Sequence, residues 1–149
     1  MRRATRWIAG AAIASATGVS LASCATPPTA GLPPSPPTVD VAMRDYWFDF
    51  NGSSIPRGRV VFQISNAGRQ YHQLALIPLP ADFPPIQAQL RGADRRVVQE
   101  LVSSPPLQPG KRDTFAAYLT PGRWAFVDFF IGPEGSHAAM GMGAEFRVR

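Results

Sequence analysis

The stretch "DFFIGPEGSHAAMGM", from Asp128 to Met142, decides the fold and raises the question of function. It follows the apolar run "WAFV" and precedes "AEFRVR", in which apolar and charged residues alternate. Such alternation is the period of a half-buried β-strand, so the stretch is predicted to be a loop that joins two strands. The loop contains a carboxylate, an imidazole and two thioethers, which are all groups that bind metal ions. The sequence therefore predicts one half of a metal site at the end of a strand.

The period of two extends through the chain from Val39 onward. It is present in "VDVAM" (39–43), "RVVFQIS" (59–65) and "YHQLALI" (71–77), and turn pairs such as Asn51-Gly52 and Pro121-Gly122 separate the strands. One segment, residues 82–104, departs from this pattern. Its apolar residues are four apart, first Ile86 and Leu90 and then Val97 and Leu101, which indicates one or two short helices. We predict an all-β Greek-key sandwich with a short helical insertion, formed by residues 39–149.

The N-terminal residues 1–23 have the pattern of a secretory signal. Three arginines precede a short apolar run from Trp7 to Leu21, which is too short for a membrane span. The run ends in Leu21-Ala22-Ser23-Cys24, which resembles a bacterial lipobox, and the resemblance implies that Cys24 is acylated and begins the mature chain. The simpler alternative is an ordinary signal that happens to be cleaved before a cysteine. We favour the lipoprotein because Cys24 is the only cysteine and lies where the motif requires it.

Residues 24–38 contain six prolines and are predicted to form an extended tether between the lipid and the domain. We therefore expect an extracytoplasmic protein that is held at the lipid bilayer of the cell membrane or outer membrane. The whole chain has 15 basic and 10 acidic residues. Removal of residues 1–23, which contain three arginines, leaves 12 basic and 10 acidic residues and a net charge of about +2. The sequence has no basic cluster of the kind that binds nucleic acid. A protein partner in the envelope would dock on Trp47 if that ring is exposed, although buried aromatic rings are more common.

Each candidate ligand also has a simple structural interpretation when it is taken alone. The sequence has two histidines, His72 and His137, and a histidine at the edge of a core is most simply hydrogen-bonded to backbone. Met140 and Met142 most simply fill a core. Asp128 by itself is most simply the end of a strand. These interpretations weaken when the residues are considered together.

The full pattern resembles the cupredoxin family from about Val39 to Val148. The matching stretches are "NAGRQYHQLAL" (66–76), "LQPGKRDTF" (107–115), "LTPGRWAFVDFF" (119–130) and "GPEGSHAAMGMGAEFRV" (132–148). In cupredoxins, a histidine that follows an Asn-x-Gly turn binds copper together with a cysteine, a histidine and a methionine near the last loop. The resemblance implies that His72, His137 and Met142 occupy ligand positions, with Met140 as the rival of Met142. It also implies that Asp128 stands where the cysteine is expected.

A carboxylate in place of a thiolate changes the chemistry that the site supports. Blue copper depends on the soft copper–sulfur bond, whereas a carboxylate and two imidazoles suit Cu(II) or zinc. We therefore expect no fast electron carrier. In one interpretation, His72, Asp128 and His137, with Met142 as an optional axial ligand, bind copper or another divalent ion and lose it as the pH falls through the histidine range.

In the other interpretation, the domain has lost its metal and is an immunoglobulin-like interaction or structural module. The presence of both histidines favours the metal, whereas the missing thiolate and the Asp128-to-His137 loop, shorter by one residue, favour the module. We predict metal binding, with the module as the alternative. We do not predict an enzyme, because no nucleophile motif such as G-x-S-x-G accompanies Asp128 and His137.

Overall fold

The computed structural model describes residues 34–52, 54–92, 96 and 102–149. The predicted signal peptide, Cys24 and most of the tether lie outside the described residues, and so does the predicted second helix at 97–101. Within the described part, no helix has the length and apolar composition needed to cross a membrane. The first strand begins at Thr38.

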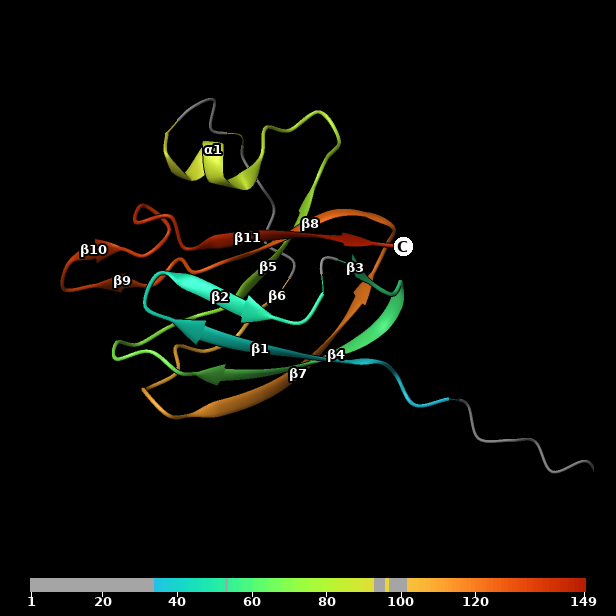
Figure 1. The fold of residues 1–149 in the computed structure, drawn as a ribbon, viewed down its shortest axis with the longest axis horizontal. Helices are drawn as coiled ribbons and strands as arrows, with labels where there is room; N and C mark the ends of the chain where they lie inside the picture. Colours follow the sequence, from blue (N-terminus) through green and yellow to red (C-terminus); the bar gives the residue numbers. More distant parts are fainter. Residues whose placement is uncertain (1–33, 53, 93–95, 97–101) are drawn as a thin grey trace, which may run out of the picture. The chain divides into compact units, whose positions relative to one another are not determined.

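Two β-sheets form the domain (Figure 1). The first sheet has the order β2 (Trp47–Phe50), β1 (Thr38–Arg44), β4 (Gly58–Asn66) and β7 (Arg112–Leu119). The second has the order β3 (Ser54–Ile55), β11 (Gly143–Val148), β8 (Gly122–Val127), β5 (Ala75–Leu79) and β6 (Val102–Ser103). β1 pairs with β4 and β11 pairs with β3 in parallel, and the other pairs are antiparallel. A separate hairpin consists of β9 (Ile131–Gly132) and β10 (Gly135–Ser136). The predicted all-β sandwich is confirmed.

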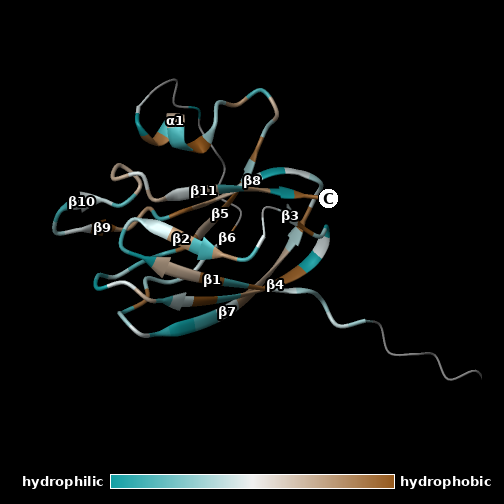
Figure 2. Ribbon diagram, in the orientation of Figure 1, coloured by the Kyte–Doolittle hydropathy of each residue, from teal (hydrophilic) through white to brown (hydrophobic). Residues whose placement is uncertain are grey.

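The main core lies between the two sheets, and strands such as β1 and β4 bury every second side chain in it. Val39, Val41 and Met43 of β1 face this core, as do Phe146 and Val148 of β11. Phe126 contacts four other rings, with centroid distances of 4.6 Å to Phe146, 5.1 Å to Phe50, and 5.8 Å to both Phe48 and Phe62. Figure 2 shows the resulting alternation of hydrophobic and hydrophilic colours along the strands. The alternation in the sequence therefore identified the inward-facing residues correctly.

A second apolar layer covers the outer face of the second sheet. Ala75 and Ile77 of β5 and Val127 of β8 are buried there, beneath the helix α1 (Ile86–Leu90). Ile86 and Leu90, which are one helical turn apart, both pack against this layer, so the first predicted helix is confirmed. The side-chain amide of Gln87 donates to the carbonyl oxygens of Gly141 and Gly143. Helix α1 thereby holds the last part of the loop that begins at Asp128.

Candidate metal centre

His72, Asp128 and His137 meet at one end of the sandwich, and all three side chains are buried. Asp128 follows directly after β8, and His137 follows directly after β10. His72 lies between β4 and β5, where it forms an isolated bridge with Leu107. In this bridge the His72 N–H donates to the Leu107 carbonyl at 3.1 Å, and the Leu107 N–H donates back at 2.8 Å. The structure therefore brings together three of the predicted site residues.

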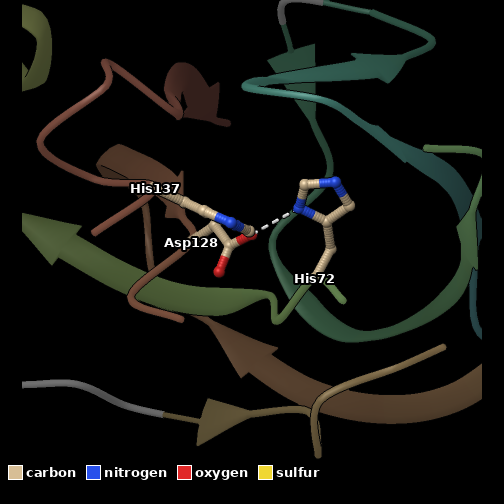
Figure 3. A group of neighbouring side chains, drawn as sticks. All are labelled: His72, Asp128 and His137. Carbon is tan, nitrogen blue, oxygen red and sulfur yellow. Dashed lines mark hydrogen bonds and ion pairs between the residues drawn. The ribbon is translucent and has the colours of Figure 1, made fainter. Parts of the chain in front are cut away.

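The carboxylate of Asp128 lies between the two imidazole rings (Figure 3). Its Oδ2 is 2.7 Å from Nδ1 of His72 and 2.8 Å from Nδ1 of His137. Its Oδ1 accepts hydrogen bonds from the backbone N–H groups of Gln73, at 3.2 Å, and Phe130, at 2.8 Å. The backbone thus fixes one carboxylate oxygen and leaves the other facing both histidines.

The second ring nitrogen of His72 has a partner of its own. Nε2 lies 3.2 Å from Oδ1 of Asp45, a residue in the turn between β1 and β2. Arg69 also donates to this carboxylate, from its backbone N–H at 2.8 Å and from its Nε at 3.0 Å. Burial acts to lower the pKa of His72, but the hydrogen bonds to Asp128 and Asp45 outweigh it and raise the pKa above the usual 6.5. Burial likewise acts to raise the pKa of Asp45, but the bonds from Arg69 and His72 hold this pKa far below its usual value.

The Asn-x-Gly turn that precedes His72 has a direct structural role. A Cβ atom at Gly68 would lie 2.5 Å from Oδ1 of Asp45 and 2.7 Å from Nε2 of His72, so no larger residue fits beside this pair. Asn66 is buried, and its Nδ2 donates to the carbonyls of Gln70 and Leu107 at 2.7 Å each. Its Oδ1 accepts from the N–H of Gly68 at 2.9 Å. Asn66 therefore holds the loop that carries His72.

The second ring nitrogen of His137 is in a different situation. Nε2 of His137 and Oε1 of Gln70 are both buried, and neither has a hydrogen-bond partner among the described residues. Both atoms lie 2.9 Å from the position that a Cβ at Gly132 would take, so they border the same small space. The amide Nε2 of Gln70 donates to the Tyr46 hydroxyl at 2.8 Å, and Tyr46 donates to Oε2 of Glu134 at 2.6 Å. This last bond raises the pKa of Tyr46 above its usual value.

The structure separates the two candidate methionines by their burial. Met142 is fully buried in the main core, whereas Met140 is 36% exposed. The Met142 N–H donates to the carbonyl of His137 at 3.0 Å, and its carbonyl accepts from the N–H of Asp128 at 3.1 Å. The backbone of Met142 is therefore connected to two of the three clustered residues.

The donor set suits a divalent ion that does not require a thiolate. Two imidazoles and a carboxylate are ligands of copper and zinc, and no cysteine occurs among the described residues. One donor atom from each of His72, Asp128 and His137 can be chosen so that all lie within 4.8 Å of one another. Oδ2 of Asp128 is 2.7 and 2.8 Å from the two Nδ1 atoms, whereas neighbouring ligands of a tetrahedral ion with bonds of about 2.1 Å lie about 3.4 Å apart. A shared ion would therefore replace these two hydrogen bonds, and the carboxylate and the rings would move slightly apart.

Asp45, Gln70 and Tyr46 are contacts of the site that sequence reasoning missed. Asp45 and Tyr46 form the tight turn between β1 and β2, and Tyr46 has a φ of 69°. Asp45 is a common turn former, but no glycine, asparagine or proline stands beside it, so this turn has only a weak signal in the sequence. The ring of Tyr46 meets the ring of His137 edge to face, with centroids 5.4 Å apart. Trp47, at the start of β2, is 51% exposed.

No family model matches the chain, and no characterised protein matches its sequence. Solved structures do share its fold. Auracyanin from Roseiflexus castenholzii superposes with a TM-score of 0.55 at 19% identity, over 75% of this chain and 96% of auracyanin. Auracyanin A, a blue copper protein from Chloroflexus aurantiacus, superposes with a TM-score of 0.52 at 13% identity, over 77% of this chain and 100% of auracyanin A. Rusticyanin from Thiobacillus ferrooxidans superposes with a TM-score of 0.51 at 20% identity, over 77% of this chain and 79% of rusticyanin. The chain therefore has a cupredoxin-like fold.

Proposed function

We propose that this protein binds copper or another divalent metal ion through His72, Asp128 and His137. The observation that carries the proposal is the buried cluster itself, in which Oδ2 of Asp128 faces Nδ1 of both rings at 2.7 and 2.8 Å. Burying ionisable groups costs free energy unless they are paired or bind an ion. A sandwich of this kind needs no such groups for its core, so their convergence at one end supports a binding role.

We assign Met142 as an optional axial ligand and give the protein no blue-copper electron-transfer role. Burial supports Met142 over Met140. The position of Asp128, directly after β8 and between the two histidines, supports a carboxylate where cupredoxins have a thiolate. A hard oxygen ligand stabilises Cu(II) or zinc without the copper–sulfur bond on which blue-copper chemistry depends. We propose binding and no catalysis.

The protein is proposed to act outside the cytoplasm, anchored to a membrane through acylated Cys24. The lipobox-like Leu21-Ala22-Ser23-Cys24 and the proline-rich residues that follow support this location. The expected result is that the wild-type protein fractionates with membranes and carries acyl chains in a mass spectrum. A Cys24→Ser variant is expected to lose both properties, and recovery of the wild type in the soluble fraction would contradict the anchor.

One observation favours a second candidate function, a metal-free binding or structural module. Oδ2 of Asp128 is within hydrogen-bond distance of both Nδ1 atoms, so the three side chains already form a closed network without an ion. These hydrogen bonds satisfy Oδ2 of Asp128 and the two Nδ1 atoms without an ion. An envelope protein would then be the partner, and the half-exposed Trp47 is the residue to test for its docking.

Titration of the purified protein with Zn(II) and with Cu(II), followed by calorimetry, distinguishes the two functions. The metal-binding function predicts one equivalent of ion in the wild type and a large loss of affinity in His137→Ala. Asp40→Asn, an exposed change on β1, is the matched control and should bind as the wild type does. Absence of binding in the wild type would leave the metal-free module as the function.

A further inference from the structure

The two imidazoles share an arrangement at Nε2, the ring nitrogen that points away from Asp128. In each case a glycine provides room for an oxygen atom beside this nitrogen: Gly68 for Oδ1 of Asp45, and Gly132 for Oε1 of Gln70. A Cβ on either glycine would come within 2.9 Å of both the ring nitrogen and the oxygen. An acceptor oxygen can therefore lie next to each Nε2 only because positions 68 and 132 are glycines, which have no side chain.

The hydrogen bonds around Gln70 have one consistent direction, and they begin at Glu134. A carboxylate only accepts hydrogen bonds, so the Tyr46 hydroxyl uses its single proton to donate a hydrogen bond to Glu134, at 2.6 Å. The Tyr46 oxygen can then only accept, and the group that faces it at 2.8 Å is the NH₂ of Gln70. The other end of the same amide, Oε1, must face the space beside Gly132. Only a donor satisfies this oxygen, and Nε2–H of His137 is the ring group that borders the space.

The direction at His72 follows from its own carboxylate. Oδ1 of Asp45 lies 3.2 Å from Nε2 and can only accept, so Nε2 carries a proton. A neutral ring with its proton on Nε2 has its lone pair on Nδ1, the atom that faces Asp128. Histidines that bind metals commonly donate their other ring N–H to such a partner, which fixes the tautomer and orients the ring.

We propose, resting on the proposed metal-binding function, that Asp45 and Gln70 are positioning residues for the ion. Asp45 holds His72 in the tautomer that directs its Nδ1 lone pair toward Oδ2 of Asp128. Oε1 of Gln70 forms no hydrogen bond with His137 in this structure, but it is the acceptor that borders Nε2 of His137, and it favours the same tautomer for that ring. Tyr46 and Glu134 act one step further out, since they set the direction of the Gln70 amide. Asp45 also places a second carboxylate next to the cluster, which offsets the charge of a divalent ion.

Zn(II) affinity, measured by competition with a chromophoric chelator, tests the roles of these residues. Asp45→Ala and Gln70→Met are expected to bind Zn(II) about 10–100-fold more weakly than the wild type. Tyr46→Phe keeps the ring and removes only the hydroxyl, and a smaller loss is expected because the Gln70 amide can then turn over. The matched controls are Asp40→Ala, Gln63→Met and Tyr118→Phe, which alter exposed residues on β1, β4 and β7 and should bind as the wild type does.

A second measurement needs no variant and so does not depend on how the variants fold. In the Zn(II)-loaded wild type with ¹⁵N-labelled histidine, long-range ¹⁵N–¹H spectra are expected to show a proton on Nε2 and the metal on Nδ1 of both rings. Ligation of either ring through Nε2 would overturn the inference. Equal Zn(II) affinity of folded Asp45→Ala, Gln70→Met and wild-type proteins would also overturn it, with the proposed function intact. Absence of Zn(II) uptake by the wild type would instead refute the proposed function, and the inference falls with it.

Discussion

Nδ1 of His72 lies 2.7 Å from Oδ2 of Asp128, although the two residues are 56 positions apart in the chain. The same oxygen is 2.8 Å from Nδ1 of His137. One carboxylate therefore joins the loop after β4 to the loop between β8 and β11, which close the same end of the sandwich. In the proposed metal-binding function, an ion would take the place of these two hydrogen bonds.

The stability of the metal-free protein is predicted to fall as the pH rises above about 6.5. The pKa of His72 is raised above 6.5 in the folded protein by Asp128 and Asp45, against the opposing effect of burial. A raised pKa means that the folded state binds the proton more tightly than the unfolded state does. The stabilisation is therefore fully present below about 6.5 and is lost as the pH rises through the folded-state pKa of His72. Urea unfolding in the presence of a chelator at several pH values measures this dependence.

Metal affinity is predicted to have the opposite dependence on pH. Binding at Nδ1 of His72 requires loss of the proton from that nitrogen, so the affinity for Zn(II) should decrease as the pH falls through the raised pKa. In the metal-free protein, His72→Gln should remove the decrease in unfolding free energy that the wild type shows as the pH rises through the pKa of His72. An unfolding free energy of the wild type that does not decrease as the pH rises above about 6.5 would contradict the assigned hydrogen bonds of His72.

Asn66→Ala is predicted to destabilise the domain by about 2–4 kcal/mol, because the carbonyls of Gln70 and Leu107 lose their donor on this side chain. The same change should weaken metal binding, since the loop it holds carries His72. Urea unfolding measures the first effect and calorimetry the second. Asn51→Ala, in an exposed bend, is the control and is expected to change stability by less than about 0.5 kcal/mol. A similar small effect for Asn66→Ala would show that this side chain does not hold the loop.

Asp128→Cys is predicted to give the protein an intense blue colour with Cu(II). The substitution places a soft thiolate between two imidazoles near a buried methionine, which is the ligand set of blue-copper sites. The experiment is best made with Cys24→Ser in the same chain, so that position 128 carries the only thiol. The single variant Cys24→Ser, with Asp128 retained, is expected to show only weak ligand-field colour. Weak colour in the double variant as well would mean that position 128 does not occupy the thiolate position of the cupredoxin fold.

The two methionines are predicted to respond differently to substitution by leucine. Met142→Leu is close to volume-conserving and should cost less than about 1.5 kcal/mol of stability, while it removes the buried thioether that is proposed as the axial ligand. A change in the electron paramagnetic resonance spectrum of bound Cu(II) is therefore expected. Met140→Leu should leave this spectrum unchanged, because Met140 is partly exposed. A change in Met140→Leu alone would reverse the assignment of the axial ligand.

Much of the fold followed from local patterns in the sequence. Alternation identified the inward-facing residues of β1, β4 and β11, because each of these strands has one face on the main core. β5 is buried on both faces, with Leu76 in the main core and Ala75 and Ile77 beneath α1. The four-residue spacing of Ile86 and Leu90 predicted that helix, but no local pattern shows which sheet a short helix covers.

The candidate site could be predicted only in part. The convergence of His72, Asp128 and His137 was implied by a family resemblance, since nothing in their spacing brings residues 56 positions apart together. Asp45 and Gln70 were missed, because their roles depend on where the β1–β2 turn and the loop after β4 lie in space. Gly68 was recognised only as a turn residue, whereas the structure shows that it makes room for the pair formed by Asp45 and His72.

We propose that Asp128 and the two histidines form one binding site for a divalent ion. The decisive experiment is native mass spectrometry of the wild type, Asp128→Ala and Asp40→Ala proteins with Zn(II) at neutral pH. One bound ion is expected in the wild type and in Asp40→Ala, and none in Asp128→Ala at the same concentration. A wild-type protein that remains metal-free, or an Asp128→Ala protein that retains its ion, would contradict it.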